Sequence, residues 1–183
     1  MKKPRIESIV IQQILDECPD TSHLGEFTGR NQDGDDLKRG SVFEHDKGNN
    51  RTLDYFVPMM SVEEHRKGLV KMGYSKGQAE EMSRSYCKAD YERILALDRG
   101  DFCYIGIKAK AVVSIPIPNN PGCVRLETLT SGGLWGVESD SGDYLDEVAQ
   151  EELNDLKSHL KAFGVYIRNF NQFAKEAEVQ EPY

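Results

Sequence analysis

The stretch that decides the fold is residues 126–160, LETLTSGGLWGVESDSGDYLDEVAQEELNDLKSHL. It begins with alternating apolar residues, passes through Ser131-Gly132-Gly133 and the only Trp of the chain, and ends in an amphipathic segment. In that last segment apolar residues recur at the three- and four-residue spacing of a helix. We therefore expect strand, turn, strand and helix, with the helix at about 142–163 and Trp135 packed over it. The apolar stripe of this helix consists of Leu145, Val148, Ala149, Leu153, Leu156, Leu160 and Phe163.

The segment before this stretch carries the clearest strand pattern. In residues 102–118, FCYIGIKAKAVVSIPIP, apolar residues alternate with Lys108, Lys110 and other residues of the opposite face. The turn signal at 119–122, NNPG, then leads to a strand at about 123–130, and the Ser-Gly-Gly turn leads to a third strand at about 134–138. The pattern predicts an α+β fold, an antiparallel β-meander with helices packed on one face.

The N-terminal half adds further elements. Residues 5–15, RIESIVIQQIL, are β-branched and apolar, which favours a strand, and residues 53–59 form a short apolar strand pattern. Ser61 with Glu64 and Ser75 with Gln78 have the spacing of capping boxes. They predict helices that begin at these serines and end near 72 and 97.

Length and composition indicate one domain over residues 1–183. We expect a mobile loop or insertion at about 29–50, which is rich in Gly, Asn and Asp, and a C-terminal extension at about 165–183. The apolar runs are shorter than the ~20 residues that span a bilayer, and the N-terminus lacks the pattern of a secretory signal. The expectation is a cytoplasmic protein without a membrane segment.

The sequence offers no pattern typical of catalysis. The four Cys are far apart, which favours buried free thiols, and the four His do not pair at helical spacing. The acidic segment at 33–35 lacks the remaining ligands of a calcium loop. We therefore expect no catalytic residues, no metal and no cofactor, and we expect that the protein is not an enzyme.

Acidic residues are concentrated in one window. Residues 126–156 hold nine Asp and Glu and no Lys or Arg, whereas the whole chain has 31 acids, 23 bases and a net charge of −8. Several acids repeat at i, i+4, where like charges repel. Either bases of the same chain, such as Lys108 and Lys110, neutralise this face, or a partner does. The candidate partner-binding residues are Glu138, Asp140, Asp143, Asp146, Glu147, Glu151, Glu152 and Asp155.

Gly132-Gly133 raises a separate question. Two consecutive backbone N–H groups can bind an anion, but the flanking acids would repel one, which favours a simple hairpin turn. The excess of acids also disfavours direct binding of nucleic acid, because phosphate contacts require Lys and Arg.

Three segments carry a recognisable pattern: IESIVIQQILDECPDTSHLGEF, DRGDFCYIGIKAKAVVSIPI and LTSGGLWGVESDSGDYLDEVAQEELNDLKSHLKAFGV, with the distinctive motif S-G-G-L-W-G-[VI]-E-S-D-S. In these segments the chain resembles a family of small phage and mobile-element proteins. The resemblance covers roughly half of the chain and brings no catalytic residues with it. It implies a setting inside the host cell, where small acidic phage proteins often bind nucleic-acid machinery.

The expectation is therefore an anti-defence inhibitor, such as an anti-CRISPR or anti-restriction protein. Its acidic helix face would bind a host protein through a basic nucleic-acid-binding groove, with no direct contact to nucleic acid. Two alternatives stay open. One is a phage replication or assembly accessory protein, and the other is a small enzyme whose site the sequence does not reveal.

Overall fold

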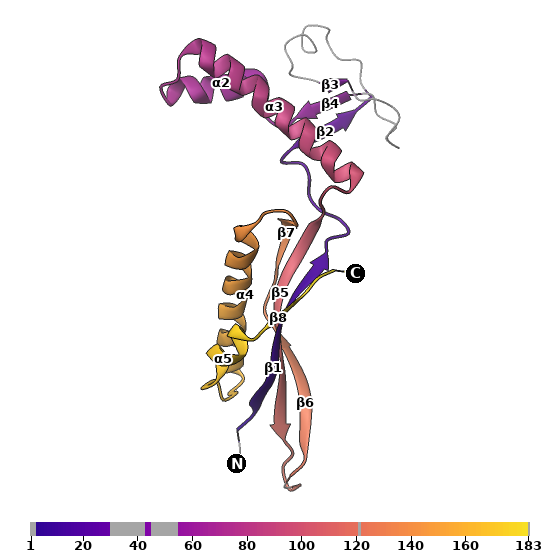
Figure 1. Ribbon diagram of the computed structural model, residues 1–183, viewed down its shortest axis with the longest axis vertical. Helices are drawn as coiled ribbons and strands as arrows, with labels where there is room; N and C mark the ends of the chain where they lie inside the picture. Colours follow the sequence, from indigo (N-terminus) through magenta and orange to yellow (C-terminus); the bar gives the residue numbers. More distant parts are fainter. Residues whose placement is uncertain (1–2, 30–42, 45–54, 121, 183) are drawn as a thin grey trace. The chain divides into compact units, whose positions relative to one another are not determined.

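The structure, a computed structural model, describes residues 3–29, 43–44, 55–120 and 122–182 (Figure 1). The chain divides into two compact units: Met1–Pro19 with Phe102–Tyr183 form the first unit, and Asp20–Asp101 form the second. Most of the predicted loop at 29–50 lies outside the described residues. The prediction of a single domain stays a prediction.

The first unit contains a five-stranded sheet with the order β6-β5-β1-β8, in which β7 also pairs with β5. β1 is antiparallel to β5, with Ile9 opposite Ala111, and parallel to β8, with Ile11 opposite Val179. The α+β class is confirmed, but the sheet is mixed, so the predicted antiparallel meander is wrong. The strand bounds are β1 Arg5–Leu15, β5 Tyr104–Pro116, β6 Val124–Thr130, β7 Leu134–Glu138 and β8 Glu178–Gln180.

The strands β6 and β7 also depart from a meander, because they lie one after the other along the same edge of β5 and do not pair with each other. Lys110 pairs with Thr130 of β6, and Ile107 pairs with Leu134 of β7. β5 has 13 residues and β6 only seven, so the chain can continue along β5 after β6 ends. Ser131-Gly132-Gly133 is therefore a break within one edge of the sheet and not a hairpin turn.

Ser131 keeps the ladder connected at this break. Its N–H donates to the Ala109 carbonyl at 2.9 Å, and the Ala109 N–H donates to Ser131 Oγ at 2.9 Å. The hydroxyl thus takes the place of a backbone carbonyl as the acceptor. Because Ser131 is buried, its N–H and its hydroxyl each require a hydrogen-bond partner.

One face of this sheet is covered by α4 (Asp143–Ala162) and the short α5 (Phe170–Lys175), as Figure 1 shows. The predicted helix over the sheet is confirmed. Leu145 and Ala149 are half-buried, and Phe163 is 69% exposed because α4 ends before it and Gly164 turns the chain at φ 72°. The helix residues buried in the core are Val148, Leu153, Leu156 and Leu160.

Trp135 lies on the other face of the sheet, so its predicted packing over α4 is wrong. Gly106 stands between Ile105 and Ile107, which face the core, and its own position therefore faces away from α4. A Cβ atom at Gly106 would lie 2.6 Å from Cδ2 of the indole. The ring covers the glycine, an arrangement that stabilises sheets where a strand lacks a side chain.

The second unit pairs a small antiparallel sheet, order β2-β4-β3, with two helices. Both predicted capping boxes, Ser61 with Glu64 and Ser75 with Gln78, are present at the starts of these helices. The core contains Leu24, Phe56 and Ile94. The bounds are β2 Gly25–Thr28, β3 Phe43–Glu44, β4 Tyr55–Pro58, α2 Val62–Lys71 and α3 Lys76–Arg99.

The packing of α4 predicts the effect of truncating its central leucine. Leu156 is fully buried, so Leu156→Ala should lower the free energy of unfolding by about 2–5 kcal/mol through lost apolar burial and a cavity. Urea unfolding followed by circular dichroism measures this change.

Leu126 is the matched control for this truncation, because it belongs to the same unit and is 62% exposed. Leu126→Ala should change the free energy of unfolding by no more than about 0.5 kcal/mol. Equal unfolding midpoints for Leu156→Ala and the parent would show that α4 does not dock on the sheet.

Candidate functional site

The acidic residues of α4 divide into two groups according to the direction in which they face. The buried stripe of α4 packs on β5, so the opposite side of the helix is open to solvent. Asp143, Glu147 and Glu151 lie on that open side, Asp146 lies at its margin, and all four are exposed. We call these four residues the outer acids.

The outer acids lack an ion-pair partner among the described residues. None of them forms an ion pair or hydrogen bond through its carboxylate with the residues that the structure describes. Asp143, Glu147 and Glu151 follow one another at i, i+4, a spacing at which side chains are neighbours and like charges repel. The repulsion that the sequence indicated is thus present on the folded helix.

Lys108 and Lys110 do not neutralise the outer acids. Both residues alternate along β5 with Ile107, Ala109 and Ala111, which face α4, so the lysines face the opposite side of the sheet. Lys157 lies on α4 itself, but its Nζ donates to Asn171 Oδ1 at 3.0 Å and lies 5.1 Å from the centre of the Phe170 ring. This lysine is therefore engaged by α5.

Glu152 and Asp155 face the sheet edge and are half-buried. The Gly133 N–H donates to Glu152 Oε2 at 2.9 Å, and the Gly132 N–H donates to Asp155 Oδ2 at 2.9 Å. His159 continues the same side of the helix, with Nδ1 3.0 Å from the Thr130 carbonyl; since a carbonyl only accepts, Nδ1 carries the proton. We call Glu152, Asp155 and His159 the polar seam.

The polar seam provides the acceptors that the break in the sheet edge requires. Where β6 ends and β7 has not begun, the N–H groups of Gly132 and Gly133 need acceptors from elsewhere in the fold. Carboxylates form strong, charge-assisted hydrogen bonds with such groups. The N–H groups of Gly132 and Gly133 do therefore bind anions, and these anions are carboxylates of the chain itself. Sequence reasoning placed Glu152 and Asp155 with the other candidates because their distance from Gly132 along the chain gave no sign of this contact.

Glu138 and Asp140 lie in the connection before α4. Glu138 is half-buried at the end of β7, and the Tyr104 hydroxyl donates to its Oε1 at 3.3 Å. The Ser141 hydroxyl donates to the Glu138 carbonyl at 2.7 Å and closes the turn. Asp140 is exposed. The α4 N-terminus has no side-chain cap at Gly142, so the charges of Asp143 and Asp146 compensate its dipole.

The thiols differ from the expectation of buried cysteines. Cys87 is buried, and its environment raises the pKa of the thiol to about 11, mainly through desolvation. Cys18 and Cys123 are exposed and Cys103 is half-buried, so the expectation is wrong for those three. Within the described part of the chain, no group of three or more His, Cys, Asp or Glu side chains is arranged to hold a metal.

Comparisons with protein-family models, with curated proteins and with solved structures each find no match to this chain. In the described residues, no helix combines the length and apolar character needed to cross a bilayer. The phage-family resemblance of the sequence stays a prediction.

The polar seam predicts different effects for two neighbouring glutamates. Glu152→Ala should lower the free energy of unfolding by about 1–2 kcal/mol, because the Gly133 N–H loses its charged acceptor. Glu151→Ala removes the same side chain from the adjacent position of the same helix. It should change stability by no more than about 0.5 kcal/mol, since Glu151 is exposed and forms no ion pair with any described residue.

Urea unfolding of both variants under the same conditions makes this comparison. Helix propensity and net charge change equally in the two proteins, so they cancel. Equal losses of stability in Glu152→Ala and Glu151→Ala would contradict a stabilising hydrogen bond between Glu152 and the Gly133 N–H.

Proposed function

We propose that the outer acids of α4 bind the basic nucleic-acid groove of another protein, and that this protein is a defence nuclease of a bacterial host. The chain would then be an inhibitor of the anti-restriction or anti-CRISPR kind. The observation that carries the proposal is the lack of any ion pair between Asp143, Asp146, Glu147 or Glu151 and the described residues.

The spacing of the outer acids supports a groove built for phosphates. Asp143 and Glu151 are eight residues apart, which corresponds to about 12 Å along a helix. Four carboxylates over that length give one negative charge per ~4 Å, close to the one charge per ~3.4 Å of a nucleic-acid strand. A Lys/Arg-lined channel would therefore meet a similar density of negative charge.

The way in which α4 is held also supports a binding role. Its inner side is fixed by buried leucines and by the hydrogen bonds of Glu152 and Asp155 to the sheet edge. A carboxylate row on a fixed helix does not have to be ordered when the partner binds, which lowers the entropic cost of association. Glu152 and Asp155 already have partners within the fold, so the proposed surface consists of the outer acids.

Uncompensated charge on one side should act mainly on the rate of encounter. Opposite potentials steer two proteins together and set their orientation, and this effect weakens as salt is added. The proposal therefore predicts an association that is fast at low ionic strength and strongly dependent on salt.

The test begins with capture of partners from a bacterial lysate on the immobilised full chain, at low salt, followed by mass spectrometry. The captured protein should be a nucleic-acid enzyme, and its own DNA or RNA substrate should displace it. With this partner purified, Glu147→Lys with Glu151→Lys should slow association by about tenfold or more, because attraction becomes repulsion.

Glu17→Lys with Glu181→Lys is the matched control. Both residues are exposed, lie outside α4, and give the same change in net charge. This variant should associate nearly as fast as the parent. The proposal is wrong if nucleic acid does not compete with the captured protein, or if both double variants associate equally.

A further inference from the structure

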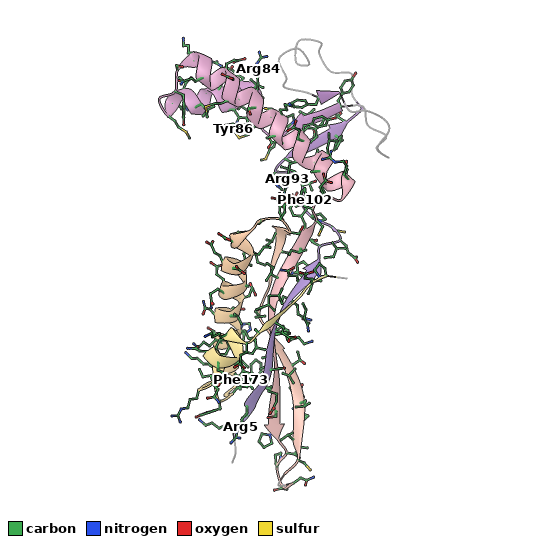
Figure 2. The ribbon with its side chains drawn as sticks, viewed as in Figure 1. Arg5, Arg84, Tyr86, Arg93, Phe102 and Phe173 are labelled. Carbon is green, nitrogen blue, oxygen red and sulfur yellow. The ribbon has the colours of Figure 1, made fainter. Side chains whose placement is uncertain are left out.

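A hollow on the first unit, away from the outer acids, has the opposite charge. It has a volume of about 390 Å³, within the range of small-ligand sites. Among the residues that the structure describes, no Asp or Glu lines it. Figure 2 labels Arg5 and Phe173 on this part of the unit. The lining residues are Arg5, Ile6, Tyr166, Arg168, Asn169 and Phe173.

Backbone contacts fix the two segments that form the hollow. Arg5, at the start of β1, forms a parallel bridge with Tyr166, and the Tyr166 N–H donates to the Pro4 carbonyl at 2.8 Å. On either side of the second segment, Val165 and Phe170 are buried in the core. The backbones that carry Arg5 and Arg168 are therefore held in place before any ligand arrives.

The two arginines differ from others in the chain. Arg66, Arg84, Arg99 and Arg125 each have a carboxylate partner, at distances of 2.6, 3.0, 2.7 and 2.8 Å. Arg5 and Arg168 form no ion pair with any described residue, although the chain has 31 acids to 23 bases. Two arginines that form no ion pair with a described residue thus line one hollow.

We infer that this hollow binds a phosphate monoester. A phosphate monoester carries a charge of about −1.5 to −2 at neutral pH, which two guanidinium groups balance. Guanidinium also matches the geometry of phosphate oxygens through paired N–H groups. Asn169 has an amide that makes no capping hydrogen bond, and Tyr166 has a hydroxyl, so both can contact the same oxygens.

The remaining lining residues indicate the rest of the ligand. Ile6 is buried and Phe173 is half-buried, so apolar surface lies beside the arginines. A ligand with a planar or apolar part next to its phosphate would use both kinds of surface. Phenyl phosphate is the simplest probe with these two parts, whereas inorganic phosphate lacks the ring and benzoate carries only one negative charge.

Binding is measured on the full chain by calorimetry and by NMR shifts at low ionic strength. Phenyl phosphate should bind saturably and more tightly than inorganic phosphate or benzoate, with NMR shifts at Tyr166, Asn169 and Phe173. Arg5→Gln with Arg168→Gln should weaken binding by about tenfold or more, since each guanidinium makes charge-assisted hydrogen bonds. Arg5→Lys with Arg168→Lys keeps the charge and should still weaken binding, because paired N–H geometry is lost.

Lys108→Gln with Lys110→Gln is the control, since it removes the same charge from the same unit at residues that do not line the hollow. This variant and Glu147→Lys with Glu151→Lys should bind phenyl phosphate as the parent does, so this test does not depend on the function of α4. The inference is overturned if no probe binds saturably, or if the arginine variants that keep the parent's circular dichroism bind equally well. Tighter binding of benzoate than of phenyl phosphate would overturn the assignment to phosphate.

Discussion

Two backbone N–H groups, those of Gly132 and Gly133, set the rotation of α4 about its axis. They lie where the edge of the sheet changes from β6 to β7, and each donates to a carboxylate of α4 at 2.9 Å. Apolar packing alone allows a helix to turn and slide over a sheet, because the hydrophobic effect is not directional. Hydrogen bonds to particular side chains are directional. Once Glu152 and Asp155 face the sheet edge, Asp143, Glu147 and Glu151 must face solvent.

This arrangement separates charge on the first unit. The outer acids lie on one side of α4, Lys108 and Lys110 face the other side of the sheet, and Arg5 and Arg168 line a hollow. Separation of opposite charges onto different surfaces keeps each surface able to attract an oppositely charged group, whereas mixed charges would cancel locally. Acids that form internal contacts stabilise the fold, and under the proposed function the outer acids bind the partner.

Local patterns in the sequence predicted most elements. The alternation in residues 102–118, the capping boxes at Ser61 and Ser75 and the leucine spacing of α4 each depend on near neighbours along the chain, and all three are confirmed. The order of strands depends on contacts between distant residues. Neither the pairing of β7 with β5 nor the position of Trp135 over Gly106 could therefore be read from local signals. The eight candidate acids all lie in the same acidic window of the sequence, so the sequence does not separate them. Glu152 and Asp155 differ from the outer acids only through hydrogen bonds to residues about 20 positions away along the chain.

Amide hydrogen exchange at Gly132 and Gly133, followed by NMR, tests the polar seam most directly. In the parent both amides should be protected, because each is bonded to a carboxylate, while the exposed Gly77 in the first turn of α3 should exchange quickly. In Glu152→Ala the Gly133 amide should lose more protection than the Gly132 amide, and in Asp155→Ala the order should reverse. Fast exchange of both glycines in the parent, or equal losses in the two variants, would contradict the account.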